Sequence, residues 1–151
     1  MVEEVLVRER ESLSAEHIAC GEELLRRIER AGLKVAAAYW VRDRTAEVPR
    51  WTLDIVMPAV DKEGPLSVYK SINEVISRPP RVSCALGVSI IEVLGLDYSF
   101  FKQLKAAIRS KTSLSDVPVS QLVVGNTMVD LYIYQFPATV TTNSSTQADG
   151  T

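Results

Sequence analysis

Asp54 and Asp130 are the two residues whose type and setting first suggest chemistry. Each interrupts an apolar stretch that alternates like a β-strand, and aspartate is depleted in strands. A carboxyl group buried in a sheet needs a hydrogen-bond partner or a counter-charge, and carboxyl groups with perturbed pKa values cluster at functional sites. If both side chains share one face of the sheet, they can hold a metal ion or act as acid and base. The competing interpretation is that each aspartate points into water from an exposed face.

A basic stretch between Tyr98 and Lys111 is the second candidate site. Lys102, Lys105 and Arg109 follow i, i+3, i+7 spacing, which places them on one face of a helix, and no acidic residue interrupts the stretch. Such a face can attract phosphate, nucleic acid or an acidic partner. It can equally be a solvated surface whose charges stabilise the C-terminal end of the helix.

Aromatic residues are concentrated in the predicted strands. Trp40, Tyr132 and Tyr134 are the candidate binding residues among them, beside Tyr39 and Trp51. Tyr and Trp are enriched at protein interfaces, so these side chains can line a pocket or a contact between subunits. In the alternative interpretation, they fill the space between the sheet and its helices.

The familiar catalytic motifs are absent from the sequence. It contains no phosphate-binding glycine loop, dinucleotide fingerprint, nucleophile elbow, paired-histidine zinc motif or calcium-binding loop. The single histidine, His17, and the two cysteines, Cys20 and Cys84, cannot complete a closed zinc site. His17 and Cys20 can touch on a helix, but such a cysteine is more often a small buried apolar residue. We therefore predict no metal site and no cofactor, with both cysteines as reduced thiols.

Composition excludes several broad classes of protein. A chain of 151 residues with 46% apolar and 24% charged residues suits one globular domain. The net charge of −2 argues against a strongly basic nucleic-acid binder. No window approaches the length of a membrane span, and the early acidic residues do not fit a secretory signal. These features predict a cytoplasmic protein that does not bind membranes.

Helical periodicity and end signals predict about three helices. They extend over about 15–31, from Pro65 to just before Pro79-Pro80, and over about 98–110. Ser14 is a suitable N-cap for the first helix, and Gly32 fits the left-handed position that follows many helices. Asp97 is a suitable cap for the third.

Alternation and apolar runs predict about five strands. They extend over 34–41, 51–58 and 86–94, with two more inside 121–136. The first two form a hairpin across a polar connector, and the last two form a hairpin at Gly125-Asn126, where a leading glycine suits a type II′ turn. Residues 112–118 and Asp61–Pro65 are interpreted as loops.

The predicted order is αββαβαββ, which does not alternate as parallel α/β units do. It indicates an α+β fold with a mostly antiparallel sheet of about five strands and about three helices. Residues 1–13 are interpreted as an N-terminal arm and 14–136 as a single domain. Residues 137–151 are rich in Ser and Thr and are predicted to be a disordered tail.

A set of motifs spread over residues 14–136 resembles a group of small uncharacterised bacterial proteins. They are Ala31-Gly32-Leu33, Tyr39-Trp40, Trp51, Pro58-Ala-Val-Asp61, Gly64-Pro65, Tyr69, Gly125-Asn126 and Asp130-Leu-Tyr-Ile-Tyr134. The resemblance implies a bacterial origin and the same domain limits. That group has no assigned activity, so the resemblance implies no mechanism and no functional residues.

Two functions from different classes remain compatible with the sequence. The favoured one is a non-enzymatic interaction domain that binds a protein partner or self-associates, since no catalytic constellation was found; nucleic acid is a less favoured partner. The alternative is a small enzyme acting on a phosphorylated or nucleic-acid substrate. In that case Asp54 and Asp130 would serve as acid and base or as metal ligands.

Overall fold

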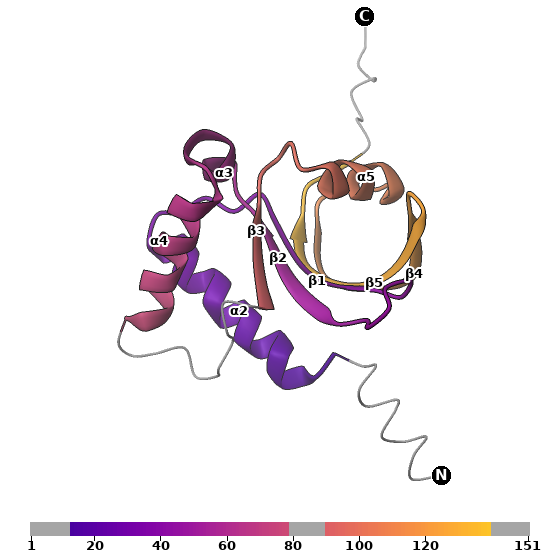
Figure 1. Ribbon diagram of the computed structural model, residues 1–151, viewed down its shortest axis with the longest axis horizontal. Coiled ribbons are helices and arrows are strands. Elements are labelled where there is room, and N and C mark those ends of the chain that lie inside the picture. Colours follow the sequence, from indigo (N-terminus) through magenta and orange to yellow (C-terminus); the bar gives the residue numbers. More distant parts are fainter. Residues whose placement is uncertain (1–12, 79–89, 140–151) are drawn as a thin grey trace, which may run out of the picture.

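The computed structural model describes residues 13–78 and 90–139, which form one curved sheet with helices on both faces (Figure 1). The elements in chain order are α2 (Ala15–Arg30), β1 (Ala37–Asp43), β2 (Trp51–Val56), α3 (Pro58–Glu63), α4 (Pro65–Ser77), β3 (Ile91–Leu94), α5 (Ser99–Ala107), β4 (Leu114–Val124) and β5 (Thr127–Phe136). Residues 1–12, 79–89 and 140–151 lie outside this description. The predicted arm, Pro79-Pro80, the N-terminal half of the strand predicted over 86–94, and most of the tail therefore fall outside it.

The sheet confirms the predicted α+β class. Its five strands have the order β3-β2-β1-β5-β4, and neighbours are antiparallel except β2 and β3. The parallel pair arises because α3 and α4 lie on the connection from β2 to β3, and parallel neighbours need such a crossover. Within 13–78 and 90–139 the observed order is αββααβαββ, with one helix more than predicted.

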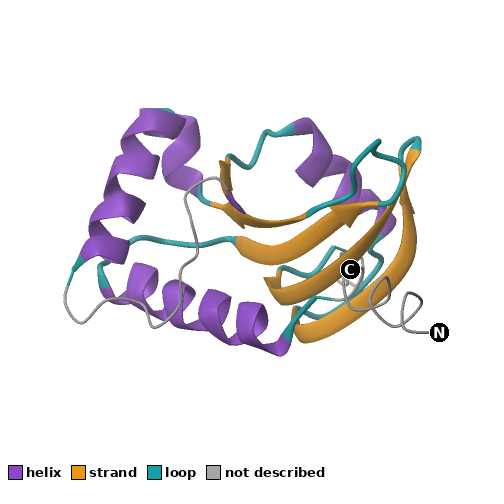
Figure 2. Ribbon diagram, turned by 60° about the horizontal axis from the view of Figure 1, so that its bottom comes forward, coloured by secondary structure: helices purple, strands orange, loops and turns teal. Residues whose placement is uncertain are grey.

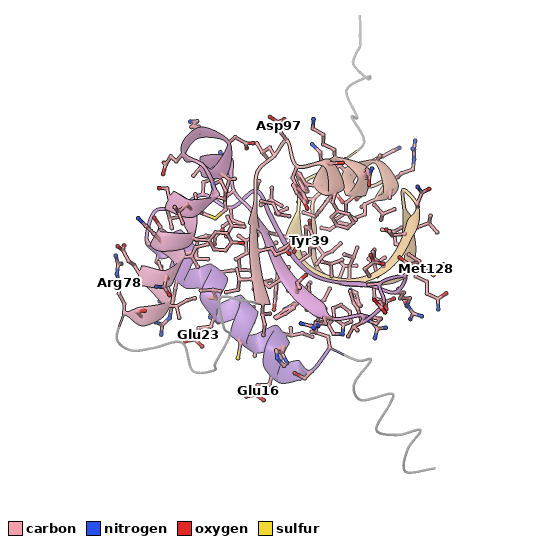
Figure 3. All side chains as sticks on the ribbon, viewed as in Figure 1. Glu16, Glu23, Tyr39, Arg78, Asp97 and Met128 are labelled. Carbon is pink, nitrogen blue, oxygen red and sulfur yellow. The ribbon has the colours of Figure 1, made fainter. Side chains whose placement is uncertain are left out.

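The two faces of the sheet carry separate cores, and the central strand β1 contributes to both. Ala38 and Trp40 pack towards α2 and α4, whereas Ala37, Tyr39 and Val41 pack towards α5. Figure 2 shows α2 and α5 on opposite sides of the sheet, and Figure 1 shows β1, β5 and β4 curving beneath α5. Tyr39 is fully buried and lies in the interior in Figure 3. Successive residues of a strand point to opposite faces, so the parity of a residue decides which core it joins.

Three predicted end and turn signals are confirmed, at Ser14, Gly32 and Gly125. Ser14 Oγ accepts a hydrogen bond from the His17 amide at 3.1 Å, as a helix N-cap does. Gly32 has a φ of +88°, the left-handed conformation expected after α2. Gly125 has a φ of +61° and leads the two-residue turn between β4 and β5, as predicted.

Three local predictions were wrong. The segment read as a loop before Pro65 contains α3, because Pro58 starts a short helix one turn earlier. Asp97 does not cap α5; Tyr98 holds the N-cap position without a side-chain hydrogen bond. The loop predicted over 112–118 is largely strand, because β4 begins at Leu114. β4 is an edge strand, where exposed polar residues and Pro118 are tolerated.

The described residues include a few on either side of 14–136, and these make contacts with the domain. Leu13 packs against the α2-side core. At the other end, the Thr139 amide donates to Ser110 O at 2.9 Å, and the Ser110 amide donates to Thr139 Oγ1 at 2.9 Å. No helix within 13–78 or 90–139 is long and apolar enough to cross a membrane.

The prediction of reduced thiols is wrong for Cys20. This residue is 5% exposed in the α2-side core and is disulfide-bonded. Cys84 lies outside the described residues. A disulfide removes the thiol, so Cys20 and His17 cannot form a thiol–imidazole couple.

Candidate functional site

Asp54 and Asp130 are both buried, with exposed fractions of 3% and 6%, so the expectation that each points into water is wrong. They lie on opposite faces of the sheet. Asp54 is the β2 partner of Tyr39, and Asp130 is the β5 partner of Arg42. Since positions 39 and 42 of β1 differ in parity, the two carboxyl groups point away from each other. They cannot share a metal ion or a substrate, and each lies in its own groove.

The groove on the α5 side is named here the Asp54 groove. It has a volume of about 560 Å³ and is lined by Val41, Asp43, Ala46, Val48, Arg50, Thr52, Asp54, Glu92, Tyr98, Phe100, Thr127 and Val129. Asp54 is buried in this lining, whereas Val48 in the β1–β2 turn and Tyr98 at the start of α5 are exposed and form the rim. Its titratable lining is three carboxylic acids and one exposed arginine, together with Tyr98. The groove is therefore acidic, with aromatic and aliphatic walls.

The Asp54 carboxyl group is poorly satisfied for a buried acid. Among the described residues its one hydrogen bond comes from Thr52 Oγ1, at 3.5 Å. The buried Tyr39 hydroxyl lies close enough to Asp54 for each group to shift the pKa of the other, but it makes no hydrogen bond of regular distance and angle. Burial and then the negative charge of Glu92 raise the pKa of Asp54 well above its usual range, against weaker opposing contributions from Tyr39 and Thr52. Burial and the Glu92 charge thus both favour the protonated form of Asp54, and a cation bound beside it would act in the opposite direction.

Glu92 lies beside Asp54 because the two residues are register partners in the parallel β2–β3 pair. The Glu92 side chain is exposed, so it keeps its hydration while Asp54 loses most of its own. Tyr98 is 48% exposed at the rim, and Phe100 is half-buried next to it. Two carboxyl groups and an aromatic wall face the same space.

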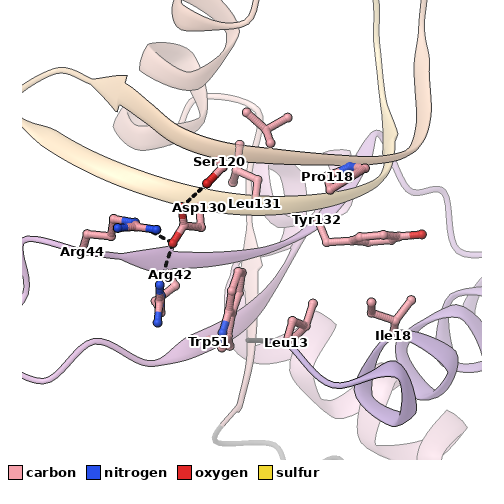
Figure 4. Close-up of a pocket in the computed structure, with 11 residues that line it drawn as sticks. Leu13, Ile18, Arg42, Arg44, Trp51, Pro118, Ser120, Asp130, Leu131 and Tyr132 are labelled. Atoms are coloured by element: carbon pink, nitrogen blue, oxygen red, sulfur yellow. Dashed lines mark hydrogen bonds and ion pairs between the residues drawn. The ribbon is translucent and has the colours of Figure 1, made fainter. Parts of the chain in front are cut away.

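The groove on the α2 side is named here the Asp130 groove (Figure 4). It has a volume of about 580 Å³ and is lined by Leu13, Ile18, Arg42, Arg44, Trp51, Pro118, Val119, Ser120, Asp130, Leu131 and Tyr132. Two arginines and one carboxylate supply its charge, and the remaining lining is apolar or aromatic apart from Ser120. Its charge is therefore opposite in sign to that of the Asp54 groove.

Asp130 is fully satisfied, unlike Asp54. Its Oδ2 accepts from Arg42 Nη2 at 2.7 Å and from Arg44 Nε at 2.8 Å. Its Oδ1 accepts from the Gln121 amide at 3.0 Å and from Ser120 Oγ at 3.3 Å. Burial alone would raise the pKa of Asp130, but the hydrogen bonds from Arg42, Gln121 and Arg44 outweigh it and lower the pKa. Asp130 is held as a carboxylate.

A β-bulge in β4 brings one of these donors to Asp130. The pairing of β4 with β5 shifts register between Val119 and Leu122, and Gln121 has a φ of +56°. This conformation is uncommon for a residue other than glycine. It turns the Gln121 amide towards the carboxylate, so Asp130 satisfies the backbone that the bulge would leave unpaired.

The basic residues of α5 do not form one free cationic face. Lys102 Nζ lies 3.7 Å from Asp97 Oδ1, and Lys105 Nζ lies 5.2 Å from the centre of the Phe101 ring. Arg109 lies past the end of the helix, since α5 ends at Ala107. The i, i+3, i+7 spacing would give one shared face only if the helix continued to Arg109.

The aromatic candidates separate into core and surface. Trp40 is fully buried, and its Nε1 donates to Tyr134 Oη at 2.8 Å. Tyr134 Oη donates in turn to Ile18 O at 2.5 Å, which fastens α2 to the sheet. These two residues fill the core and present no surface to a partner. Tyr132 is half-buried and lines the Asp130 groove.

Sequence reasoning missed Glu92, Arg42 and Arg44. Glu92 interrupts the apolar run Ile91–Leu94 in the same way as Asp54 interrupts its strand, so the signal was present. The two arginines were assigned to a polar connector, and only the extension of β1 to Asp43 places Arg42 inside the sheet. Within 13–78 and 90–139 no group of three or more His, Cys, Asp or Glu residues can hold a metal ion.

Comparisons of this chain with family models, with curated proteins and with solved structures find no match. The resemblance to small bacterial proteins therefore stays a prediction. The two grooves, rather than kinship with a known protein, are the basis for proposing what the chain does.

Proposed function

We propose that this chain is a non-enzymatic binding domain whose Asp54 groove receives a basic side chain, lysine or arginine, of a protein partner. One observation carries the proposal: Asp54 is 3% exposed, lines an open groove, and has a single 3.5 Å hydrogen bond among the described residues. Buried polar groups are normally hydrogen-bonded or paired, so the missing partner is expected to come from a ligand.

The chemistry of the groove favours a cation as that ligand. A positive charge next to Asp54 would offset the two contributions that raise its pKa, which are burial and the charge of Glu92. Tyr98 and Phe100 provide ring faces of the kind that attract ammonium and guanidinium groups. Bound cations would therefore be paired, hydrogen-bonded and partly stacked in one place.

The rim of the groove favours a protein over a free small amine. Val48 is 63% exposed and Tyr98 is 48% exposed, and both border the groove. Hot spots of protein interfaces are enriched in Tyr and Arg and lie in desolvated pockets, and exposed side chains such as Val48 and Tyr98 can exclude water from a basic side chain bound between them. The partner would place one basic side chain in the groove and apolar contacts on its rim.

Self-association through the sheet edges is a weaker form of the same proposal. At one edge, the Tyr69 hydroxyl donates to Ile91 O at 3.3 Å and accepts from the Val93 amide at 3.0 Å, so part of the β3 edge is already satisfied. At the other edge, β4 carries Pro118 and the bulge near Gln121. Prolines, bulges and covered edges all oppose the addition of another strand.

A small enzyme remains the second candidate, with Glu92 in place of Asp130. A specific observation favours this version: the raised pKa of Asp54 would keep a proton on one carboxyl group beside a second one. Such pairs can act as acid and base. An acidic groove is a poor site for a phosphorylated or nucleic-acid substrate, so an enzyme here would act on a neutral or cationic substrate.

The disulfide at Cys20 bears on the location of the protein. Disulfides persist in oxidising compartments and are rare in the cytosol. We therefore place the protein in an oxidising compartment instead of the cytoplasm that the sequence predicts. Detection of free Cys20 thiol in protein alkylated directly in its source cells would contradict this placement.

Nuclear magnetic resonance titration of the whole chain tests the binding proposal. The ligands are short capped peptides that differ at one position, which is lysine, arginine or the uncharged isostere norleucine. We expect the lysine and arginine peptides to shift the amide signals of Thr52, Glu92 and Tyr98, and the norleucine peptide to shift them far less. Binding should weaken in Asp54→Asn and in the exposed variant Glu92→Gln, and persist in Ser120→Ala on the opposite face.

Two results would contradict the proposal. Equal shifts of the amide signals with the norleucine and lysine peptides would mean that the groove binds the peptide through apolar contacts alone. Unchanged lysine affinity in both Asp54→Asn and Glu92→Gln would mean that the carboxyl groups do not bind the cation. Turnover of an amine or glycoside panel that Asp54→Asn abolishes would support the enzyme instead.

A further inference from the structure

The Asp130 groove contains a guanidinium group that is fixed in place and has unused donors. Arg44 is bound through Nε to Asp130 Oδ2 at 2.8 Å, and its side chain is 37% exposed. Among the described residues, no hydrogen bond is made by Nη1 or Nη2 of Arg44. The planar guanidinium carries five N–H donors in a rigid fork, so the four on Nη1 and Nη2 remain available to a ligand of the groove that Arg44 lines.

Arg42 adds a second cation at the floor of the same groove. Its side chain is 8% exposed, and its Nη2 lies 2.7 Å from Asp130 Oδ2. Its Nε is buried without a hydrogen-bond partner, and its guanidinium lies 5.4 Å from the centre of the Trp51 ring. Asp130 neutralises only one of the two arginine charges, so the lining of the groove has a net positive charge.

Asp130 holds Arg42 and Arg44 in position without a ligand, because both arginines donate to its carboxylate. Its four hydrogen-bond donors come from β1, from the turn after it and from the bulge of β4, so its position is fixed from several directions. An arginine whose orientation is already set loses less conformational entropy on binding than a free surface arginine. The acceptor that best fits a guanidinium fork is a carboxylate, bound through two parallel hydrogen bonds.

The walls of the groove indicate what carries that acceptor. In Figure 4 the two arginines and Asp130 lie at one end of the groove with Trp51 beside them, and Tyr132, Pro118 and Ile18 lie toward the other end. The volume of about 580 Å³ is in the range of small-molecule sites, and predominantly apolar walls with few fixed polar groups are typical of them.

We infer that the Asp130 groove binds a carboxylate attached to an apolar body, with Arg44 and Arg42 contacting the carboxylate and Trp51 and Tyr132 contacting the body. Asp130 is a positioning residue in this site. The inference is independent of the proposed function, since the groove lies on the other face of the sheet and prefers the opposite charge.

Fluorescence titration with phenylbutyrate tests the inference on the full chain. Trp51 lines the groove, while the only other tryptophan, Trp40, is fully buried in the core. We expect phenylbutyrate to change the emission and phenylbutanol, which lacks the charge, to bind at least about tenfold more weakly. Two further arms distinguish sources of the carboxylate, namely an acetylated apolar peptide with a free C-terminus and the same peptide as an amide.

Variants separate binding from folding. Arg44 is partly exposed, so Arg44→Gln is expected to fold and to weaken phenylbutyrate binding by at least about tenfold. Arg50→Gln, in the other groove, should leave the affinity unchanged. Tighter binding of phenylbutyrate than of phenylbutanol, or of the free-acid peptide than of its amide, supports the inference. Equal affinity for phenylbutyrate and phenylbutanol, no binding of either acid, or unchanged affinity in Arg44→Gln would overturn it.

Discussion

Replacement of Asp130 by alanine is expected to lower the free energy of unfolding by about 3–5 kcal/mol, because it leaves the buried Arg42 cation without its counter-charge. The Arg42 and Asp130 side chains are 8% and 9% exposed, and their ion pair spans 2.7 Å. Arg44 contributes much less, since a side chain that is 37% exposed is still solvated and such pairs contribute about 0–1 kcal/mol. The predicted loss therefore comes mainly from Arg42.

Ser120→Ala is the matched control for this prediction. It removes the longest of the four hydrogen bonds to Asp130, at 3.3 Å, and leaves both ion pairs intact. We expect it to cost less than about 1 kcal/mol. Adding Arg42→Met to Asp130→Ala removes the orphaned charge, so the double variant should be more stable than the sum of the single effects predicts.

Urea unfolding at neutral pH, followed by circular dichroism, measures these differences. The pKa of Asp130 is lower in the folded than in the unfolded chain, so its stabilisation is complete above the usual value of 3.8 and is lost as the pH falls through the folded value. The difference in free energy of unfolding between the wild type and Asp130→Asn should therefore become smaller at acid pH. If Asp130→Ala costs no more than Ser120→Ala, or if this difference is independent of pH, the proposed role of Asp130 as counter-charge is refuted.

Three other predictions follow from the structure. The stability of Asp54→Asn relative to the wild type should increase as the pH rises. Because the pKa of Asp54 is raised in the folded chain, the stabilisation that protonated Asp54 gives the wild type is complete below 3.8 and is lost as the pH rises through the folded value. A difference in urea midpoint between the two proteins that does not change with pH would contradict this. Gly21→Ala should destabilise by about 1–3 kcal/mol although alanine normally favours helices, since the added Cβ would overlap the Tyr134 hydroxyl; thermal unfolding that shows a gain would exclude the overlap. Because Cys84 is the only other cysteine, we expect it to be the disulfide partner of Cys20; non-reducing peptide mapping should recover the linked pair, and two alkylatable thiols would disprove it.

Local signals made much of the fold predictable. Ser14 and Gly32 marked the ends of α2, and Gly125 marked the final hairpin, because capping and turn geometry depend on only a few neighbouring residues. The start of β4 was missed because Pro118 and exposed polar residues look like a loop unless the strand is known to lie at a sheet edge. A strand of that kind is defined by its partner β5 rather than by its own composition.

The candidate site was predictable in its residues and not in its arrangement. Alternation within each strand correctly drew attention to Asp54 and Asp130 as carboxyl groups in apolar surroundings. Which face each one joins depends on the pairing of Tyr39 with Asp54 and of Arg42 with Asp130, and the second pairing joins residues far apart in the chain. No local pattern contains that register.

β1 contributes Val41 to one groove and Arg42, the next residue, to the other. A one-residue deletion within this strand would invert every side chain beyond it and exchange the two faces. Arg42 would then take the place of Val41 and face the apolar core beneath α5, while Asp43 would take the place of Arg42 beside Asp130. Both grooves would be lost in a single event. During evolution, therefore, β1 is expected to tolerate substitution but not change in length. The exposed turn at 45–50 can change in length without inverting the strand, although Ala46, Val48 and Arg50 would then alter the lining of the Asp54 groove.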